Sequence, residues 1–222
     1  MRIALLGGTG DIGEGLALRW AFHTNHEVVV GSRDPERART KAEEYETELS
    51  SRGVDAKVNG FANEMAADRA RVVVVAVPAY HVSDTIETVA DKLDEGDVLV
   101  SPATGMKRDD EGFHYHRPNA GSVTQLAVDA APAGVDVVGA FHNLAAGRLA
   151  DLDAELGIDT LLVGDDRDAK ETVRLLAEDI DGLRALDAGS VANAPEVEAL
   201  TPLLVNVGRN NEGMHDLGVR FR

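Results

Sequence analysis

Three glycines near the start of the chain have the spacing of a phosphate-binding turn. Gly8, Gly10 and Gly13 fit G-x-G-x-x-G. In this pattern the first glycine allows a tight turn, the second lets the backbone approach a pyrophosphate, and the third lets helix and strand pack closely. Free N–H groups at the start of the next helix then face the anion. A glycine-rich turn without a ligand is the alternative, but the position between a first strand and a helix favours dinucleotide binding.

The end of the second expected strand carries cations at a place where many dinucleotide-binding proteins carry an acid. The strand ends at Ser32-Arg33, and Arg37 follows one helical turn later. A carboxylate there binds the ribose hydroxyls of NAD, whereas an arginine accommodates the 2′-phosphate of NADP. Ser32, Arg33 and Arg37 therefore predict NADP(H) as the dinucleotide. The alternative is that the arginines only balance the neighbouring Asp34 and Glu36.

Strand-like and helix-like segments alternate around these residues. Such a βαβ order predicts an α/β fold with a doubly wound, mostly parallel, Rossmann-type sheet. Residues 72–77 form a continuous apolar run, which is typical of a strand in the middle of a parallel sheet. The expected strands are residues 2–6, 27–31, 56–60, 72–77, 98–101 and 135–141, and the expected helices are residues 11–23, 35–52 and 82–93.

The last third of the chain has a different pattern. We expect strands at residues 160–163 and 183–186 and helices at residues 168–180 and 197–207, forming a smaller α/β layer against the sheet. The predicted division is a dinucleotide-binding domain of residues 1–145 and a small C-terminal domain of residues 146–222 that completes the cleft.

The chain is strongly acidic: 39 Asp and Glu against 22 Lys and Arg give a net charge of −17. Such a surface repels nucleic acid, whose binding depends on neutralising phosphates. A well-solvated surface is one interpretation; adaptation to high salt, which screens the repulsion, is the one we favour. The chain has no cysteine, no signal-peptide pattern and no apolar run long enough to cross a bilayer, so we expect a cytoplasmic protein without membrane contact.

Four stretches together resemble one enzyme family. These are MRIALLGGTGDIGEGLALRWA, VVVGSR, DIDGLRALDAG and EALTPLLVN. They are similar to the F420-dependent NADP reductases, which pass a hydride between NADP and the deazaflavin coenzyme F420, and the similarity runs almost from end to end. The resemblance implies an oxidoreductase whose partners are small-molecule cofactors only, and we expect a homo-oligomer, a dimer. Looser forms of these stretches occur in membrane-bound metal reductases, but this chain has no membrane-spanning pattern.

Carried over by position, the resemblance also implies site residues. Those expected to bind the cofactors are Gly8, Thr9, Gly10, Asp11, Ile12 and Gly13 at the pyrophosphate, Ser32, Arg33 and Arg37 at the 2′-phosphate, Val77 and His81 near the nicotinamide, His142 to Ala146 where the rings stack, and Leu217 at the deazaflavin. F420 also carries a phosphate and an acidic tail, and the cations free to meet it are Lys107, Arg108, Arg148, Arg209, Arg220 and Arg222.

Several other candidates remain open. His81 follows the central strand at the edge where ligands bind, but it can equally be a satisfied polar residue. His114 and His116 alternate as metal ligands in a strand do, although no third ligand is fixed by spacing, so a loop near the cleft is the simpler interpretation and no metal is expected. No catalytic acid–base residue is predicted. The alternatives are an NADPH-dependent carbonyl or imine reductase, with His81 or Tyr80 as proton donor, and a non-catalytic NADPH-binding regulator.

Overall fold

A computed structural model describes all 222 residues. Its centre is a six-stranded, fully parallel sheet in the order β3-β2-β1-β4-β5-β8. The chain moves outward on one side of β1 and then on the other, so the predicted doubly wound Rossmann-type sheet is confirmed. The strands are β1 (Arg2–Leu6), β2 (Glu27–Ser32), β3 (Val58–Ala62), β4 (Val72–Val75), β5 (Val98–Ser101) and β8 (Asp136–Gly139).

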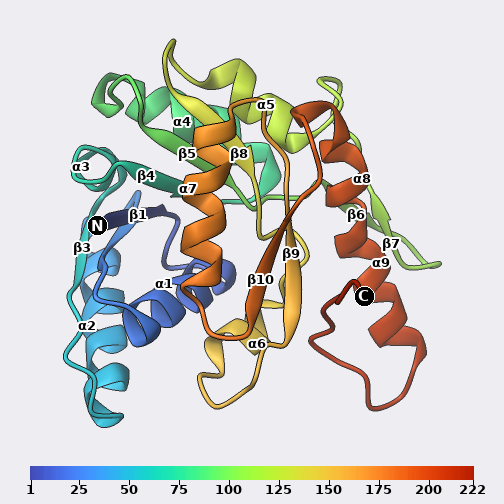
Figure 1. Cartoon of the computed structure of the whole chain (residues 1–222), viewed down its shortest axis with the longest axis horizontal. Helices are drawn as coiled ribbons and strands as arrows, with labels where there is room; N and C mark the ends of the chain where they lie inside the picture. The colour runs from blue at the N-terminus through green and yellow to red at the C-terminus, as the bar shows by residue number, and fades with distance from the viewer.

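Helices cover both faces of this sheet (Figure 1). They are α1 (Asp11–His23), α2 (Pro35–Ser51), α3 (Asn63–Ala67), α4 (Val82–Val89), α5 (Val123–Ala130) and α7 (Arg167–Glu178), and the short α6 (Ala146–Ala150) packs on α1. The bounds of α1 are those predicted, and α2 ends one residue earlier. The predicted helix of residues 82–93 is α4 followed by a 3₁₀ turn at Ala90–Lys92. The short helices α3, α5 and α6 were not predicted.

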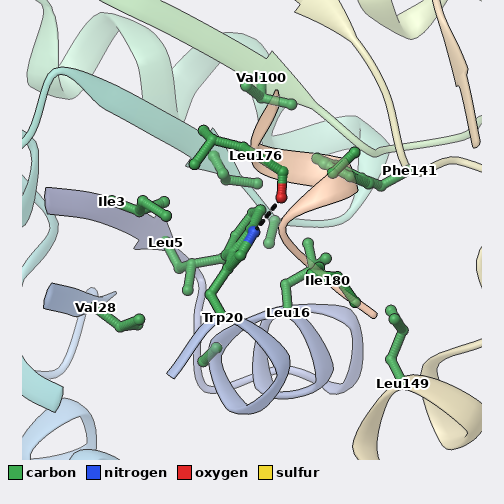
Figure 2. Packing of buried hydrophobic residues seen from close by; sticks show 14 of the residues in the cluster. Ile3, Leu5, Leu16, Trp20, Val28, Val100, Phe141, Leu149, Leu176 and Ile180 are labelled. Atoms are coloured by element: carbon green, nitrogen blue, oxygen red, sulfur yellow. Dashed lines mark hydrogen bonds between the residues drawn. The ribbon is translucent and has the colours of Figure 1, made fainter. Parts of the chain in front are cut away.

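Alternate residues of each strand face opposite sides of the sheet, and each side has its own core. Ile3 and Leu5 belong to a cluster of 35 buried residues beneath α1, α2 and α7. Ala4 and Leu6 belong to a cluster of 17 beneath α3, α4 and α5. Trp20 of α1 lies in the middle of the larger cluster, where its indole N–H donates to the carbonyl of Leu176 at 2.7 Å (Figure 2).

The later part of the chain shares the larger core. Strands β9 (Ile158–Leu162) and β10 (Leu183–Asp187) form a parallel pair joined by α7, as the predicted second α/β layer requires. An antiparallel bridge from Gly139 to Val163 attaches this pair to β8. Because the larger cluster contains residues from both sides of position 145, the proposed division into two domains stays a prediction.

The chain ends in two consecutive helices and a tail. Helices α8 (Ala194–Glu198) and α9 (Leu200–Asn210) lie beside a small antiparallel hairpin of β6 (Met106–Arg108) and β7 (Phe113–Tyr115), as Figure 1 shows. The predicted helix of residues 197–207 is therefore two helices with a break at Ala199. No helix of the structure is long and apolar enough to cross a bilayer.

Two contacts fix α6 at the edge of the site. Gly15 lets α1 approach closely, because a Cβ at this position would collide with the side chain of Leu149 on α6. Arg19, which is buried, donates to the carbonyls of Leu149 and Arg148 at 2.9 Å and so satisfies groups at the end of α6. The α1–α6 packing therefore sets where the loop before α6 lies.

Candidate functional site

The glycine-rich turn joins β1 to α1 at the carboxyl edge of the sheet. The left-handed turn residue is Gly7, with φ of 77°, rather than Gly8 as the sequence pattern implied. Gly8 and Gly13 are required by packing, since a Cβ on Gly13 would lie 2.6 Å from the Cα of Gly8. Gly10 is different: the nearest protein atom to a Cβ there is 3.4 Å away. The open side of Gly10 thus faces the cleft, as the approach of a phosphate requires.

Asp11 and Ile12 open α1, and they lie on different sides of it. Asp11 is exposed as the first residue of the helix, whereas Ile12 is half-buried and packs against the larger core. The first-turn N–H groups around them are available to an anion, because Gly10 offers no side chain to cap the helix. Asp11 and Ile12 therefore contribute backbone rather than side chains to this turn.

Two arginines that follow β2 have no carboxylate partners. The Oγ of Ser32 accepts from the N–H of Asp34 at 3.1 Å, and the Asp34 carboxylate caps α2 by accepting from the N–H groups of Glu36 and Arg37. Neither Arg33 nor Arg37 forms an ion pair. The Nη2 of Arg37 instead lies 3.5 Å from the carbonyl of Thr9. The two guanidinium groups are thus free for an anion beside the glycine-rich turn.

These residues line one cleft of about 580 Å³. It extends from the glycine-rich turn and the end of β2 to the segment after β4, where Val77 and His81 lie. The side chain of Val77 packs close to Gly7. His81 closes a 3₁₀ turn before α4, and its ring has no hydrogen-bond partner but lies 4.4 Å from the ring of Tyr80, centroid to centroid. Thr9, Ser32, Arg33, Arg37, Val77 and His81 are therefore brought together as predicted from sequence.

A second cavity of about 530 Å³ lies at the same edge of the sheet. Three segments that are far apart in sequence line it: residues 143–147 after β8, one face of α9, and residues 214–217. It contains both Ala146 and Leu217, which the sequence resemblance assigned to one ring site. Its walls are mostly apolar, as a flat aromatic ligand prefers.

The tail that closes this cavity is anchored by an ion pair. Asp159 of β9 is buried and binds Arg184 of β10 in a bidentate pair at 2.9 and 2.7 Å. The pair also holds Phe221, whose N–H donates to Asp159 and whose carbonyl accepts from Arg184. The hydrogen bond from Arg184 holds the pKa of the Asp159 carboxyl below its usual value. Residues 214–217 are thereby held against α6 and α9.

The comparisons with known proteins agree with this geometry. Residues 2–105 match the family model described as NADP oxidoreductase, coenzyme F420-dependent. The F420-dependent NADP reductase of Methanothermobacter marburgensis is 37% identical over 224 residues, which is 100% of this chain and 98% of that protein. The enzyme of the same name from Methanocaldococcus jannaschii is 36% identical over 93% of this chain and 92% of its own length.

This chain belongs to the F420-dependent NADP reductases. A solved structure from Arthrobacter sp. FB24, titled as a candidate F420-dependent NADP reductase, superimposes with a TM-score of 0.80 at 22% identity. The superposition covers 100% of this chain and 99% of that one, so the whole fold is shared. The predicted family is confirmed by the curated relatives.

In this member of the F420-dependent NADP reductases, His142 lies beneath the site rather than in it. The side chain is buried, and its Nε2 is 3.4 Å from the Oγ1 of Thr124. It lines neither the cleft nor the second cavity. Its backbone carbonyl, however, accepts from the hydroxyl of Thr201, which does line the second cavity. His142 therefore supports the floor of the reductase site through its backbone.

Burial gives His142 a testable pH signature. It lowers the pKa of the imidazole to about 3, whereas an unfolded histidine titrates near pH ~6.5. Between these pH values the unfolded chain binds a proton that the folded protein does not. The free energy of unfolding therefore has its full value above pH ~6.5 and falls by about 1.4 kcal/mol per pH unit below it. Urea unfolding at about pH 7.5 and 5.0 should show a loss roughly 2 kcal/mol larger for the natural protein than for His142→Gln. Equal losses would contradict this assignment.

Several residues of the reductase site were missed by sequence reasoning. Asn63, at the start of α3, lines the first cleft and has a buried side-chain oxygen without a partner. Thr201 lies on α9, and its hydroxyl is 3.3 Å from that of Thr104, which follows β5. Asn63 and Thr104 both follow the carboxyl end of a parallel strand, where ligands bind in such sheets. That rule was a signal available from the sequence.

The histidines of the HYH stretch are not gathered for metal binding. His114 on β7 pairs with Asp109 of the same hairpin at 2.9 Å. No group of three or more histidine, aspartate or glutamate side chains in the chain is placed to hold a metal ion. The hairpin instead packs on α9, beside the second cavity.

Proposed function

We propose that this protein transfers a hydride between NADP(H) and coenzyme F420, with the dinucleotide in the first cleft and the deazaflavin ring in the second cavity. The observation that carries the proposal is the 36–37% identity to F420-dependent NADP reductases over nearly the whole chain. The site residues fit such ligands. Gly10 is open to the cleft, Arg33 and Arg37 lack anionic partners, and the buried oxygen of Asn63 lacks a donor.

In this proposal the protein supplies position and charge. The hydride passes directly between the nicotinamide ring and the deazaflavin ring, so no side chain has to carry a proton in the transfer step. Arg33 and Arg37 hold the 2′-phosphate, the turn at Gly10 holds the pyrophosphate, and Val77 limits the nicotinamide end. Thr201, which lines the second cavity, also contacts Thr104 after β5. Holding two reactants about 3–3.5 Å apart in the right orientation supplies most of the rate.

An absorbance assay with reduced F420 and NADP tests the function directly. The deazaflavin spectrum should change with NADP present and remain unchanged with buffer alone. With deuterium at C4 of NADPH, the label should appear on the deazaflavin and not exchange into water during the transfer step. Absence of F420 turnover, or release of the label to solvent in that step, contradicts the proposal and favours reduction of a carbonyl or imine.

His81→Ala is expected to slow turnover by less than about tenfold. His81 lines the cleft without a hydrogen-bond partner, so we propose that it acts by position alone. Removing a general acid or base typically costs about 10²–10⁴-fold. The kcat of the variant with NADPH and F420 decides between the two roles. Tyr80→Phe tests the other candidate proton donor in the same assay, since Tyr80 is 79% exposed beside His81.

We propose that the acidic surface makes the protein more stable at high salt. With 39 acidic and 22 basic residues, unscreened repulsion opposes folding, and molar salt reduces the Debye length to about 3 Å. Salt also weakens surface ion pairs, but these contribute little individually. The melting temperature should therefore rise between about 0.1 and 2 M KCl. A melting temperature that does not change with salt would leave only the interpretation of a well-solvated surface.

We also propose a homodimer located in the cytoplasm. Leu203 and Val207 are exposed one turn apart on α9, at 56% and 37%, and such apolar side chains are common at subunit contacts. Sedimentation equilibrium measures the state directly, and a monomer at all concentrations would contradict the dimer.

A further inference from the structure

We propose that Arg209, together with Arg108, which contacts the same aromatic ring, binds the phosphate and acidic tail of F420 at the mouth of the second cavity. This inference rests on the proposed function, because it takes the second cavity as the deazaflavin site. Six cations were candidates for this role from sequence alone. The structure separates several of them by the contacts that they already make.

Arg209 is the only arginine or lysine that lines the second cavity. It lies near the end of α9, one face of which forms a wall of the cavity, and its side chain is exposed. The other charged or titratable side chains of the lining are His215 and Asp216, which hydrogen-bond to each other at 3.0 Å. The Asp216 carboxylate lies beside Gly147 at the start of α6. The single permanent positive charge of this cavity is therefore that of Arg209.

Arg209 and Arg108 have no anionic partner. Neither forms a hydrogen bond or an ion pair, although 39 acidic residues compete for only 22 cations in this chain. Arginines elsewhere in the chain do form ion pairs with carboxylates; Arg174, for example, pairs with both Glu171 and Glu178.

Both guanidinium groups lie near the ring of Phe113. The guanidinium carbons of Arg209 and Arg108 lie 5.5 and 5.6 Å from the centre of its ring, within the range of a cation–π interaction. Asn206, one turn before Arg209, accepts from the N–H of Phe113 at 2.9 Å and donates to its carbonyl at 2.6 Å. This pair of hydrogen bonds locks β7 to α9. The two charges are therefore positioned by packing, as a preorganised anion site requires.

The remaining candidates are less suited. Arg148 donates twice to the carbonyl of Glu155, and Arg220 lies near the buried Asp159 carboxylate, whose pKa it helps to lower. Lys107 directly precedes Arg108 on β6, but Arg108 is the residue that contacts Phe113. Guanidinium also matches phosphate and carboxylate with two parallel hydrogen bonds, which an ammonium does not.

The test compares two deazaflavins with the same ring. One is F420; the other is the corresponding deazariboflavin, which lacks the phosphate and the acidic tail. Arg209→Gln should raise the KM for F420 about fivefold or more and leave the KM for the deazariboflavin unchanged, as expected for a lost charged contact at an exposed rim. Arg209→Lys should lie between the two. The difference for F420 should shrink in 1 M KCl, because the contact is screened.

Arg167→Gln is the matched control. Arg167 opens α7, is exposed, makes no hydrogen bond and does not line the cavity, and its loss changes the net charge equally. If Arg209→Gln raises both KM values equally, or neither, the inference is overturned while the proposed function stands. If the natural protein turns over neither deazaflavin with NADP, the proposed function fails and this inference fails with it.

Discussion

Arg33→Ala is expected to weaken NADPH binding by about ten- to a hundredfold while changing NADH binding little. Arg33 lies at the end of β2, exposed and free of carboxylates, and it lines the cleft beside the glycine-rich turn. Losing a charge-assisted hydrogen bond to the 2′-phosphate costs roughly 1.5–3 kcal/mol, and NADH has no phosphate there. Equilibrium titration with both reduced cofactors, followed by nicotinamide fluorescence, measures the two affinities.

A matched control lies on the next helix. Arg39 of α2 is also exposed, but its guanidinium pairs with Glu36, so Arg39→Ala should leave both affinities within about twofold. Arg39 thus balances an acid, whereas Arg33 and Arg37 do not. Equal losses of NADPH and NADH affinity in Arg33→Ala would contradict the 2′-phosphate assignment.

The sequence predicted those parts of the site that are local. The turn from Gly8 to Gly13 and the cations after β2 lie within about one strand and one helix of each other, and short-range patterns determine them. Continuous valines at residues 72–75 likewise predicted β4 in the middle of the sheet. Even here the pattern misplaced the turn residue. Gly7 has the positive φ of the turn, whereas the pattern assigned that role to the adjacent Gly8.

The second cavity was beyond such patterns. Its walls come from residues 143–147, α9 and residues 214–217, and only the resemblance to known reductases connected them. The helices that were missed are short. The five residues of α3 complete too few turns to show a 3.6-residue period, and they are stabilised by packing against β2 and β3. For α5 a signal existed: Ser122 caps it, and Gln125 follows three residues later.

The unpaired cations also required the structure. Sequence analysis gave six arginines and lysines equal standing for the F420 tail, since charge alone does not reveal which cations are already occupied. Arg148 is occupied by a carbonyl, and Arg209 is not. The distinction depends on contacts between residues that are seven or nearly a hundred positions apart, such as Arg148 with Glu155 and Arg209 with Phe113.

The buried carboxylate of Glu198 is expected to be the most important single polar side chain for stability. It is completely buried on α8, and its oxygens accept from the N–H groups of Val123 and Thr124, the Thr124 hydroxyl and the Tyr115 hydroxyl. Burial raises the pKa of this carboxyl, and the four hydrogen bonds oppose that effect. Glu198 thus satisfies the first two N–H groups of α5, which would otherwise be orphaned.

Glu198→Ala should therefore reduce the free energy of unfolding by about 3–5 kcal/mol, since each buried donor left without a partner costs roughly 1–3 kcal/mol. Glu198→Ala also removes the unfavourable burial of a charge, so the loss is smaller than the sum over four unpaired donors. Urea denaturation followed by Trp20 fluorescence measures it, because Trp20 is fully buried.

Glu196→Ala is the control, since Glu196 lies on the same helix but is exposed and makes no hydrogen bond. Its loss should change stability by less than about 0.5 kcal/mol. Glu198→Gln keeps the shape and one acceptor oxygen, and it should fall between the two.

The Thr124 hydroxyl that Glu198 accepts from is also the neighbour of His142, so Glu198→Ala should loosen the floor beneath the second cavity. A loss in Glu198→Ala no larger than that in Glu196→Ala would mean that water replaces the carboxylate at no cost, and the network would then have no role in holding that floor.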